Sequence, residues 1–199
     1  MSGNVEQRIL TAFSQLLIHN GYQRTTTKKI AQVAQVNEST LFRHFKDKRG
    51  ILQQLISKYH DDIQMINKNY QLVGDLDKDI MNFSIIYQNF IKQHLALFLT
   101  GIRESQNLPE LQTVIKNLLD LIRKILAEKF EQMQKTGEIA QDIDKNVEID
   151  NLVLLNLGQA IMQHSFPNCV FQTQPHAFVQ NNIRAYSQHL KPKNNKTIR

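Results

Sequence analysis

Several side chains between residues 25 and 52 combine positive charge with hydrogen-bond donors. Arg43 carries a guanidinium group, which can donate two parallel hydrogen bonds to O6 and N7 of guanine. Thr40 can offer a methyl group to thymine or a hydroxyl to a base, and His44 can donate to a phosphate or a base acceptor. Such side chains would suit contact with DNA. The alternative is that they are ordinary solvated residues, so the elements that position them must decide.

A second set of polar residues flanks these side chains. Thr27 and Lys28 stand at the start of one predicted short helix, and Lys48 stands in the first turn of a later, long helix. The free backbone N–H groups of a helix N-terminus bind phosphate, and a nearby hydroxyl or ammonium group adds to that contact. Residues 25–27 are also good helix caps, and capping and phosphate contact can coexist.

The spacing of apolar residues predicts two short helices in this segment. The first covers residues 28–34 and the second covers residues 38–45, with Asn37 as the cap of the second. The side chains expected to face inward are Ile30, Ala31, Ala34, Leu41 and Phe45. The outward positions of the second helix are therefore Glu38, Ser39, Thr40, Arg43 and His44.

This arrangement has the spacing of a helix-turn-helix motif. Such a motif has a short helix, a tight turn of about three residues, and a second helix that can enter the major groove of DNA. Ala31 and Ala34 are small, so the two helices can cross closely. An αα-hairpin with no DNA-binding role would bury the same residues, and the spacing alone leaves that alternative open.

Apolar residues recur at intervals of three and four along the rest of the chain, and no stretch alternates convincingly with a period of two. The fold class is therefore all-α. The first predicted helix covers residues 5–19 and stops at Asn20-Gly21. Further helices are predicted over residues 47–70, 77–100, 109–136, 146–165 and 176–190.

Positive charge is concentrated in the first third of the chain. The 199 residues carry a formal net charge of +6, and residues 1–60, with nine basic and three acidic side chains, account for the same +6. Residues 61–190 carry 11 basic and 15 acidic side chains, and residues 191–199 carry four basic ones. This asymmetry favours an N-terminal module that meets a polyanion, although chance placement on a solvated surface would look the same.

Other features argue against several classes of protein. The longest apolar runs, such as residues 95–99, are far shorter than the roughly 18 residues that a membrane-spanning helix needs, and the N-terminus does not have the pattern of a signal peptide. The only cysteine, Cys169, cannot form an internal disulfide and fits a reducing compartment. We therefore expect a cytoplasmic protein that does not associate with membranes.

No motif of a familiar enzyme class is present. The sequence lacks HExxH, GxGxxG, P-loop and GxSxG motifs and any cysteine-rich metal-binding spacing, and its seven histidines are scattered. We therefore expect no enzyme activity, no catalytic residues, no metal site and no cofactor.

The helix-turn-helix segment contains two characteristic stretches. Residues 21–31 read Gly-Tyr-Gln-Arg-Thr-Thr-Thr-Lys-Lys-Ile-Ala, and residues 40–48 read Thr-Leu-Phe-Arg-His-Phe-Lys-Asp-Lys, followed by Leu52. Over about residues 5–55 the chain resembles the N-terminal domain of TetR-type transcriptional regulators. Residues 136–139, with Asp142 and Asp144, are similar to a turn that often precedes the last two helices in that family.

The resemblance implies a division of the chain into three parts. Residues 1–48 would form the DNA-binding domain, residues 49–190 a helical domain for effector binding and dimerisation, and residues 191–199 a basic, flexible tail. The function implied is that of a sequence-specific homodimeric repressor, released from a palindromic operator on double-stranded DNA by an unknown small-molecule effector. The effector would favour a separation of the two N-terminal modules that no longer matches successive major grooves. An architectural DNA-binding protein without an effector is the alternative.

Three residues depart from the pattern of the family. Gln35 stands where the turn commonly has glycine, which costs conformational energy if φ is positive. Phe42 stands where a tyrosine usually contacts phosphate, so its ring is left to pack against sugar or core. The negative charge of Glu38 at the helix N-terminus interacts favourably with the helix dipole but repels phosphate. Its carboxylate can instead accept a hydrogen bond from N4 of cytosine. The predicted DNA-binding residues are Thr27, Lys28, Asn37, Glu38, Ser39, Thr40, Phe42, Arg43, His44 and Lys48.

An aromatic face runs along the predicted helix over residues 77–100. Such a face is more often core than pocket, but the resemblance places the effector pocket in this body, with Tyr87 and His94 as its polar groups. The candidate pocket residues are Phe83, Tyr87, Phe90, His94 and Phe98, together with Met162 and Phe166 from the penultimate helix.

The segment over residues 147–164 is apolar over more than half of its helical circumference. Such a helix needs cover on two sides, and pairing with its copy and with residues 176–190 would form a two-fold interface. A helix fully buried within a monomer is the alternative.

Overall fold

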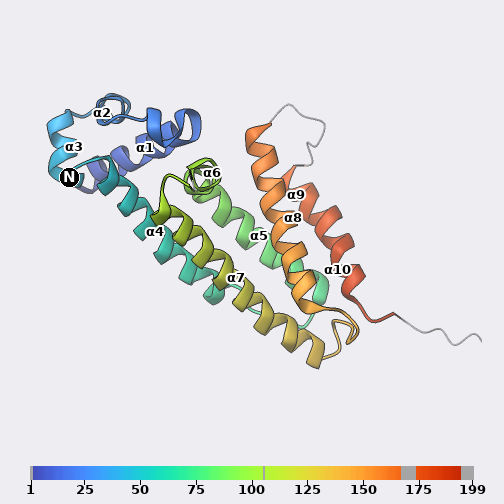
Figure 1. Ribbon diagram of the computed structural model, residues 1–199. Helices are drawn as coiled ribbons and strands as arrows, with labels where there is room; N and C mark the ends of the chain where they lie inside the picture. Colours follow the sequence, from blue (N-terminus) through green and yellow to red (C-terminus); the bar gives the residue numbers. More distant parts are fainter. Residues whose placement is uncertain (1, 105, 167–173, 194–199) are drawn as a thin grey trace, which may run out of the picture. The chain divides into compact units, whose positions relative to one another are not determined.

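The computed structural model describes residues 2–104, 106–166 and 174–193, without the side chains of residues 2–4. Every regular element in these ranges is helical, which confirms the predicted all-α class. Figure 1 shows the elements, which are α1 (Ser2–Arg24), α2 (Thr27–Ala34), α3 (Glu38–Phe45), α4 (Lys48–Asn69), α5 (Leu76–Gln93), α6 (Leu95–Glu104), α7 (Pro109–Lys135), α8 (Lys145–Ser165), α9 (Pro175–Ala177), η1 (Phe178–Ile183) and α10 (Arg184–Leu190). Cys169 and residues 194–199 of the predicted tail lie outside the described residues.

The chain forms two compact units. Residues 1–64 and 93–118 make up the first, and residues 65–92 and 119–199 make up the second. The first unit therefore contains α1, α2, α3 and α6, and the second contains α8, α9, η1, α10 and nearly all of α5. None of the helices in the described ranges is long and apolar enough to cross a membrane.

The chain turns at the predicted end of the first helix. Helical geometry resumes up to Arg24, but Gly21 itself has φ +74° and ψ 170°, a conformation that is unfavourable for a residue with a side chain. The buried hydroxyl of Thr25 donates to the carbonyl oxygen of Gly21 at 2.7 Å and closes this corner ahead of α2. The predicted stop at Asn20-Gly21 is thus confirmed.

The prediction of a single helix over residues 77–100 is wrong, because the structure divides this segment into two helices at His94. The carbonyl oxygen of His94 accepts hydrogen bonds from the N–H groups of Leu97 (2.9 Å) and Phe98 (3.2 Å), which start α6. The residues from Leu95 to Gly101 are all buried, so apolar spacing continues through the break. Without a glycine or proline at this corner, periodicity could not reveal it.

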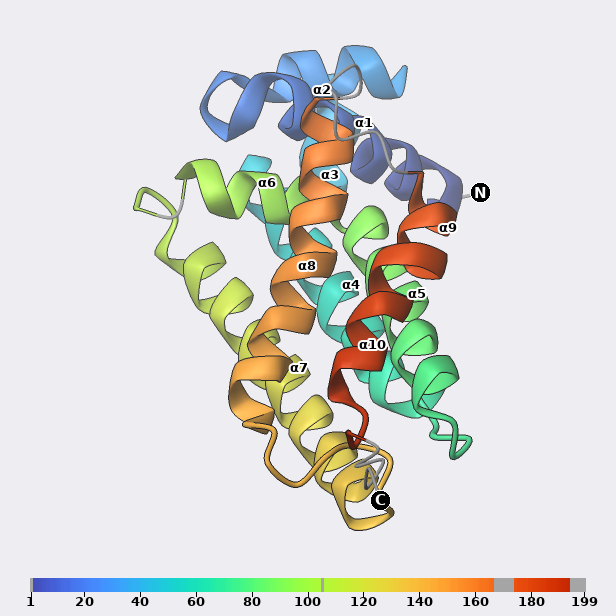
Figure 2. The same cartoon turned by 90° about the vertical axis from the view of Figure 1, so that its right-hand side faces the viewer.

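In the second unit, α8 lies beside the segment formed by η1 and α10 (Figures 1 and 2). The hydroxyl of Tyr186 donates to the carbonyl oxygen of Glu148 at 2.6 Å and joins the two. The helix predicted over residues 176–190 is present as three consecutive helical segments, of which the middle one, η1, is a π-helix.

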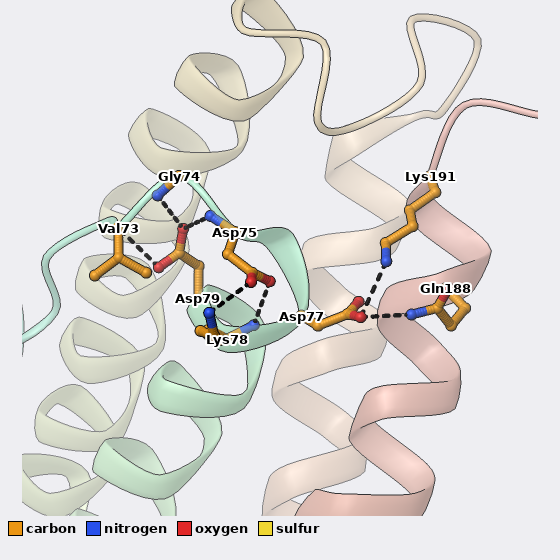
Figure 3. A network of polar contacts seen from close by, with 8 residues as sticks. All are labelled: Val73, Gly74, Asp75, Asp77, Lys78, Asp79, Gln188 and Lys191. Carbon is orange, nitrogen blue, oxygen red and sulfur yellow. Dashed lines mark hydrogen bonds and ion pairs between the residues drawn. The ribbon is translucent and has the colours of Figure 1, made fainter.

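A buried carboxylate fixes the loop that precedes α5 (Figure 3). The side chain of Asp79 is 1% exposed and accepts hydrogen bonds from the backbone N–H groups of Val73 (2.8 Å), Gly74 (3.1 Å) and Asp75 (3.3 Å). Buried polar groups are stable only when they are paired in this way, so Asp79 holds the loop in one conformation.

A second carboxylate of α5 joins this helix to α10 and to the residue that follows α10 (Figure 3). Asp77 accepts hydrogen bonds from Ser187 Oγ at 2.7 Å and Gln188 Nε2 at 2.6 Å, and its Oδ2 lies 3.0 Å from Lys191 Nζ. Lys191, the first residue of the predicted tail, is therefore held by an ion pair.

Candidate nucleic-acid interface

The two short helices begin and end close to their predicted positions, α2 over Thr27–Ala34 and α3 over Glu38–Phe45. Thr26 caps α2, because its hydroxyl oxygen accepts the N–H of Lys29 at 3.3 Å. Asn37 occupies the N-cap position of α3, but its side chain makes no capping hydrogen bond. The prediction that Asn37 caps α3 is therefore right in position and wrong in mechanism.

The turn between the helices passes through a left-handed residue. Gln35 has φ +53° and ψ +48°, the region that the glycine of related turns adopts without strain. Its N–H donates to the carbonyl oxygen of Gln32 at 3.1 Å, and that of Val36 donates to Ala31 at 3.0 Å. These bonds close the C-terminus of α2 around the unfavourable residue.

A side chain of α1 supports this turn, and sequence reasoning missed it. Arg8 Nη2 donates to the carbonyl oxygens of Ala34 at 2.5 Å and Gln35 at 2.6 Å. Arg8 precedes this turn by more than 25 residues, so no local spacing could have shown the contact. The guanidinium group thus satisfies carbonyl groups at the end of a helix, where intrahelical donors are absent.

The faces of the two helices are divided as expected. The predicted inward side chains are all buried, namely Ile30, Ala31, Ala34, Leu41 and Phe45. On α3, Ser39, Phe42 and Arg43 are exposed, and Glu38, Thr40 and His44 are half-buried. The core therefore anchors one side of α3, and its exposed side chains lie on the other side.

Arg43 lies next to other predicted contact residues. A surface hollow beside the turn is lined by Asn37, Thr40 and Arg43, together with Gln32 of α2. Asn37 and Arg43 are exposed, so an amide and a guanidinium group offer hydrogen-bond donors around this hollow. This is the chemistry that recognises base edges and phosphates.

Three other predicted contacts already have partners within the first unit. Thr27 Oγ1 donates to Glu38 Oε1 at 2.6 Å, which joins the first residues of α2 and α3. His44 Nδ1 lies 3.0 Å from Glu6 Oε1 of α1, and its side chain is only 15% exposed. Lys28, in contrast, is exposed in the first turn of α2.

Lys48 is anchored against the end of α1. Its Nζ donates to the carbonyl oxygen of Tyr22 at 2.9 Å and lies 4.1 Å from the centroid of the Tyr22 ring. Burial lowers the pKa of Lys48 from its usual value, against the opposing effect of Glu104. One of its three donors is thus used internally, and the others can point to a phosphate.

The residues of the predicted effector pocket are divided between the two units. Phe83, Tyr87 and Phe90 are buried in the second unit, where the rings of Phe83 and Tyr87 stack at 5.5 Å. In the first unit, His94 and Phe98 are buried, and His94 Nε2 lies 3.0 Å from Asp62 Oδ2. Of the remaining two, Met162 is half-buried in the last turn of α8, and Phe166, which follows the helix, is 55% exposed.

No group of three or more His, Cys, Asp or Glu side chains in the described ranges could hold a metal ion.

Comparison with known proteins gives a family for this arrangement. The model of the bacterial regulatory proteins of the tetR family matches residues 9–55, which include every predicted DNA-binding residue. The HTH-type transcriptional regulator YvkB of Bacillus subtilis (strain 168) is 30% identical over 133 residues, which are 67% of this chain and 69% of YvkB. The HTH-type transcriptional regulator UidR of Escherichia coli (strain K12) is 23% identical over 163 residues, 78% of each chain.

The similarity also extends to solved structures. A bacterial regulatory protein in the tetR family from Rhodococcus RHA1 matches with a TM-score of 0.73 at 15% identity, over 94% of this chain and 97% of that one. The fold is therefore shared over nearly the whole length of both chains.

Proposed function

Because the chain belongs to the TetR family of bacterial regulatory proteins, we propose that it is a homodimeric repressor that leaves a palindromic DNA operator when a small molecule binds. The observation that carries the proposal is the outward face of α3, where Arg43 stands beside Asn37 and Thr40 on a helix anchored by its buried side. We place this activity in the cytoplasm, and we assign it no catalytic step.

The proposed division of labour follows the position of these residues. Residues 1–48 bind DNA, and residues 49–190 bind the effector and form the dimer. Within the first part, Arg43 reads a base, while Lys28 and Lys48 meet phosphates on either side of α3. Asn37, Ser39, Thr40, Phe42 and His44 complete the contact surface.

An exposed apolar strip on α8 supports the dimer. Val147, Leu154 and Leu155 are 52%, 64% and 41% exposed, although each is apolar. A side chain added at Gly158 would meet no atom within 4 Å, so this part of the helix is open to a close neighbour. A second copy of the chain is the partner that fits, since two DNA-binding modules match two half-sites about one helical turn apart.

The direct test is selection of DNA fragments by the purified full-length protein, followed by sequencing. We expect a palindrome whose half-sites lie one helical turn apart, and an affinity that falls steeply with salt concentration. Absence of any enriched sequence would contradict the proposal.

Two substitutions separate base reading from phosphate contact. We expect Arg43→Ala to reduce the preference for the selected site over random DNA, by about tenfold or more. We expect Lys28→Ala to weaken binding to all sequences equally and to lower the salt dependence by about one ion. Equal losses on all sequences for Arg43→Ala would make Arg43 a phosphate contact instead.

A further inference from the structure

We propose that Glu38 selects a cytosine in each half-site of the operator, and that Thr27 is the residue that positions its carboxylate. The inference rests on the proposed function, since it names the base that the start of α3 reads. It begins from the hydrogen bond between these two side chains, the first residues of α3 and α2.

The hydrogen bond gives the carboxylate one orientation. Thr27 Oγ1 donates to Glu38 Oε1 at 2.6 Å, the short distance expected when a hydroxyl meets an ionised acceptor. Both side chains are half-buried, so the pair is neither sealed in the core nor fully solvated. With Oε1 held in this way, Oε2 is the carboxylate oxygen that remains to accept a hydrogen bond from DNA at the start of α3.

A fixed acceptor discriminates among the four bases. In the major groove, cytosine presents only its N4 amino group, which donates to a carboxylate. Guanine presents acceptors at O6 and N7, and thymine presents an acceptor at O4, so both repel a carboxylate. Adenine has a donor at N6, but the lone pair of its N7 faces the same carboxylate. Cytosine is therefore the base that Glu38 favours, partly by rejecting the others.

The bond also changes the role of Thr27. A hydroxyl group has one proton, and the proton of Thr27 is directed at Glu38 rather than at a phosphate. Lys28, the next residue, is exposed and carries a positive charge, so it meets the phosphate in this part of the interface. The negative charge of Glu38 weakens binding to every sequence, and that cost is offset only where cytosine is present.

The experiment compares the DNA sequences selected by the wild type with those selected by Glu38→Gln. Glutamine has the same shape, but its amide nitrogen is a donor. We expect cytosine at one position of each half-site to be replaced by a base that presents an acceptor, with a change in preference of about tenfold or more. The other positions should stay the same, and affinity for random DNA should rise because a negative charge is lost.

Substitutions of Thr27 test the positioning role. Thr27→Val keeps the shape of the side chain without its hydroxyl, and we expect it to weaken the preference for cytosine at that same position. Thr27→Ser keeps the hydroxyl and should retain the preference for cytosine. Thermal unfolding of each variant shows whether the domain is intact, which separates a specific change in base preference from a general loss of structure.

The outcomes distinguish this inference from the proposed function. If the wild type selects no sequence, the proposed function itself fails. If the wild type selects a palindrome and Glu38→Gln selects the same one, Glu38 does not read a base and the inference is overturned. A change of equal size at all positions would also overturn it, because that is the signature of a nonspecific charge effect.

Discussion

The guanidinium group of Arg8 donates a hydrogen bond to the carbonyl oxygen of Gln35, 2.6 Å away, at the residue of the turn whose φ is +53°. A second bond from the same nitrogen reaches the carbonyl oxygen of Ala34 at 2.5 Å. A strained residue persists only when its surroundings determine its conformation, and α1 supplies that constraint here. Arg8 therefore maintains the angle at which α3 leaves the turn.

The contact leads to a prediction for Arg8→Met, which keeps the length of the side chain but not its donors. We expect the free energy of unfolding to fall by about 2 kcal/mol, since hydrogen bonds to a charged donor are lost. Urea unfolding measures the change. Arg24→Met removes the same charge from the exposed end of α1 and is the matched control. Equal effects of the two variants would show that charge alone, not the turn, is responsible.

The contact of Arg8 also shows what the sequence could and could not reveal. The bounds of α2 and α3 follow from apolar spacing and caps, which are local properties, and both helices were predicted within one residue. The partners of Arg8 and Lys48 depend on how distant helices pack, so a single sequence carries no sign of them. The break at His94 was missed for a related reason, because residues 95–101 of α6 are all buried and their apolar pattern continues from α5.

The same distinction applies to the candidate site. The outward positions of α3 follow from its two buried anchors, Leu41 and Phe45, and the structure places them as expected. The hydrogen bond between Thr27 and Glu38 could not be predicted, since it joins the first turns of two different helices. Base reading by these residues stays a prediction that DNA selection must test.

Asp79→Asn should destabilise the second unit. The buried carboxylate accepts three backbone N–H groups, and an amide that presents its own donor cannot replace all three bonds. We expect the free energy of unfolding to fall by about 2 kcal/mol in urea titrations. Asp142→Asn, at an exposed residue of the same unit, removes the same charge and is the control, which should have little effect. If Asp79→Asn left the free energy of unfolding unchanged, the loop would be held by other contacts.

The buried His94 should make stability depend on pH. Burial lowers its pKa from 6.5, although Asp62 opposes the shift, and Lys58 acts in the same direction as burial. The imidazole of His94 therefore binds a proton more tightly in the unfolded chain than in the folded protein. We expect the contribution of the neutral, buried His94 to folding stability to be fully present above pH 6.5. It should be lost as the pH falls below 6.5 towards the lowered pKa.

Urea unfolding between pH 5 and 8, compared between the wild type and His94→Gln, measures this contribution. The difference in stability should narrow as the pH falls, with a slope of at most about 1.4 kcal/mol per pH unit for one proton. His60→Gln, which changes an exposed histidine of α4, is the control. A constant difference between wild type and His94→Gln at all pH values would contradict the role given to burial.

The exposed strip on α8 gives the sharpest test of assembly. Leu154 is 64% exposed, and two copies of α8 that bury it against each other would remove that apolar surface from water. A glutamate in its place would put two like charges into such an interface, so we expect Leu154→Glu to sediment as a folded monomer. Because the side chain is exposed within one chain, the substitution should leave helical content unchanged.

Operator binding should fail together with dimerisation. A monomer holds one half-site only, so its affinity for the full palindrome should fall to that for an isolated half-site, while the salt dependence per module stays the same. Val73→Glu, at an apolar residue that is 68% exposed in the loop before α5, introduces the same charge elsewhere and should leave the dimer intact. If Leu154→Glu still sediments as a dimer and binds the palindrome, the interface does not include this strip, and the apolar face of α8 must serve another contact.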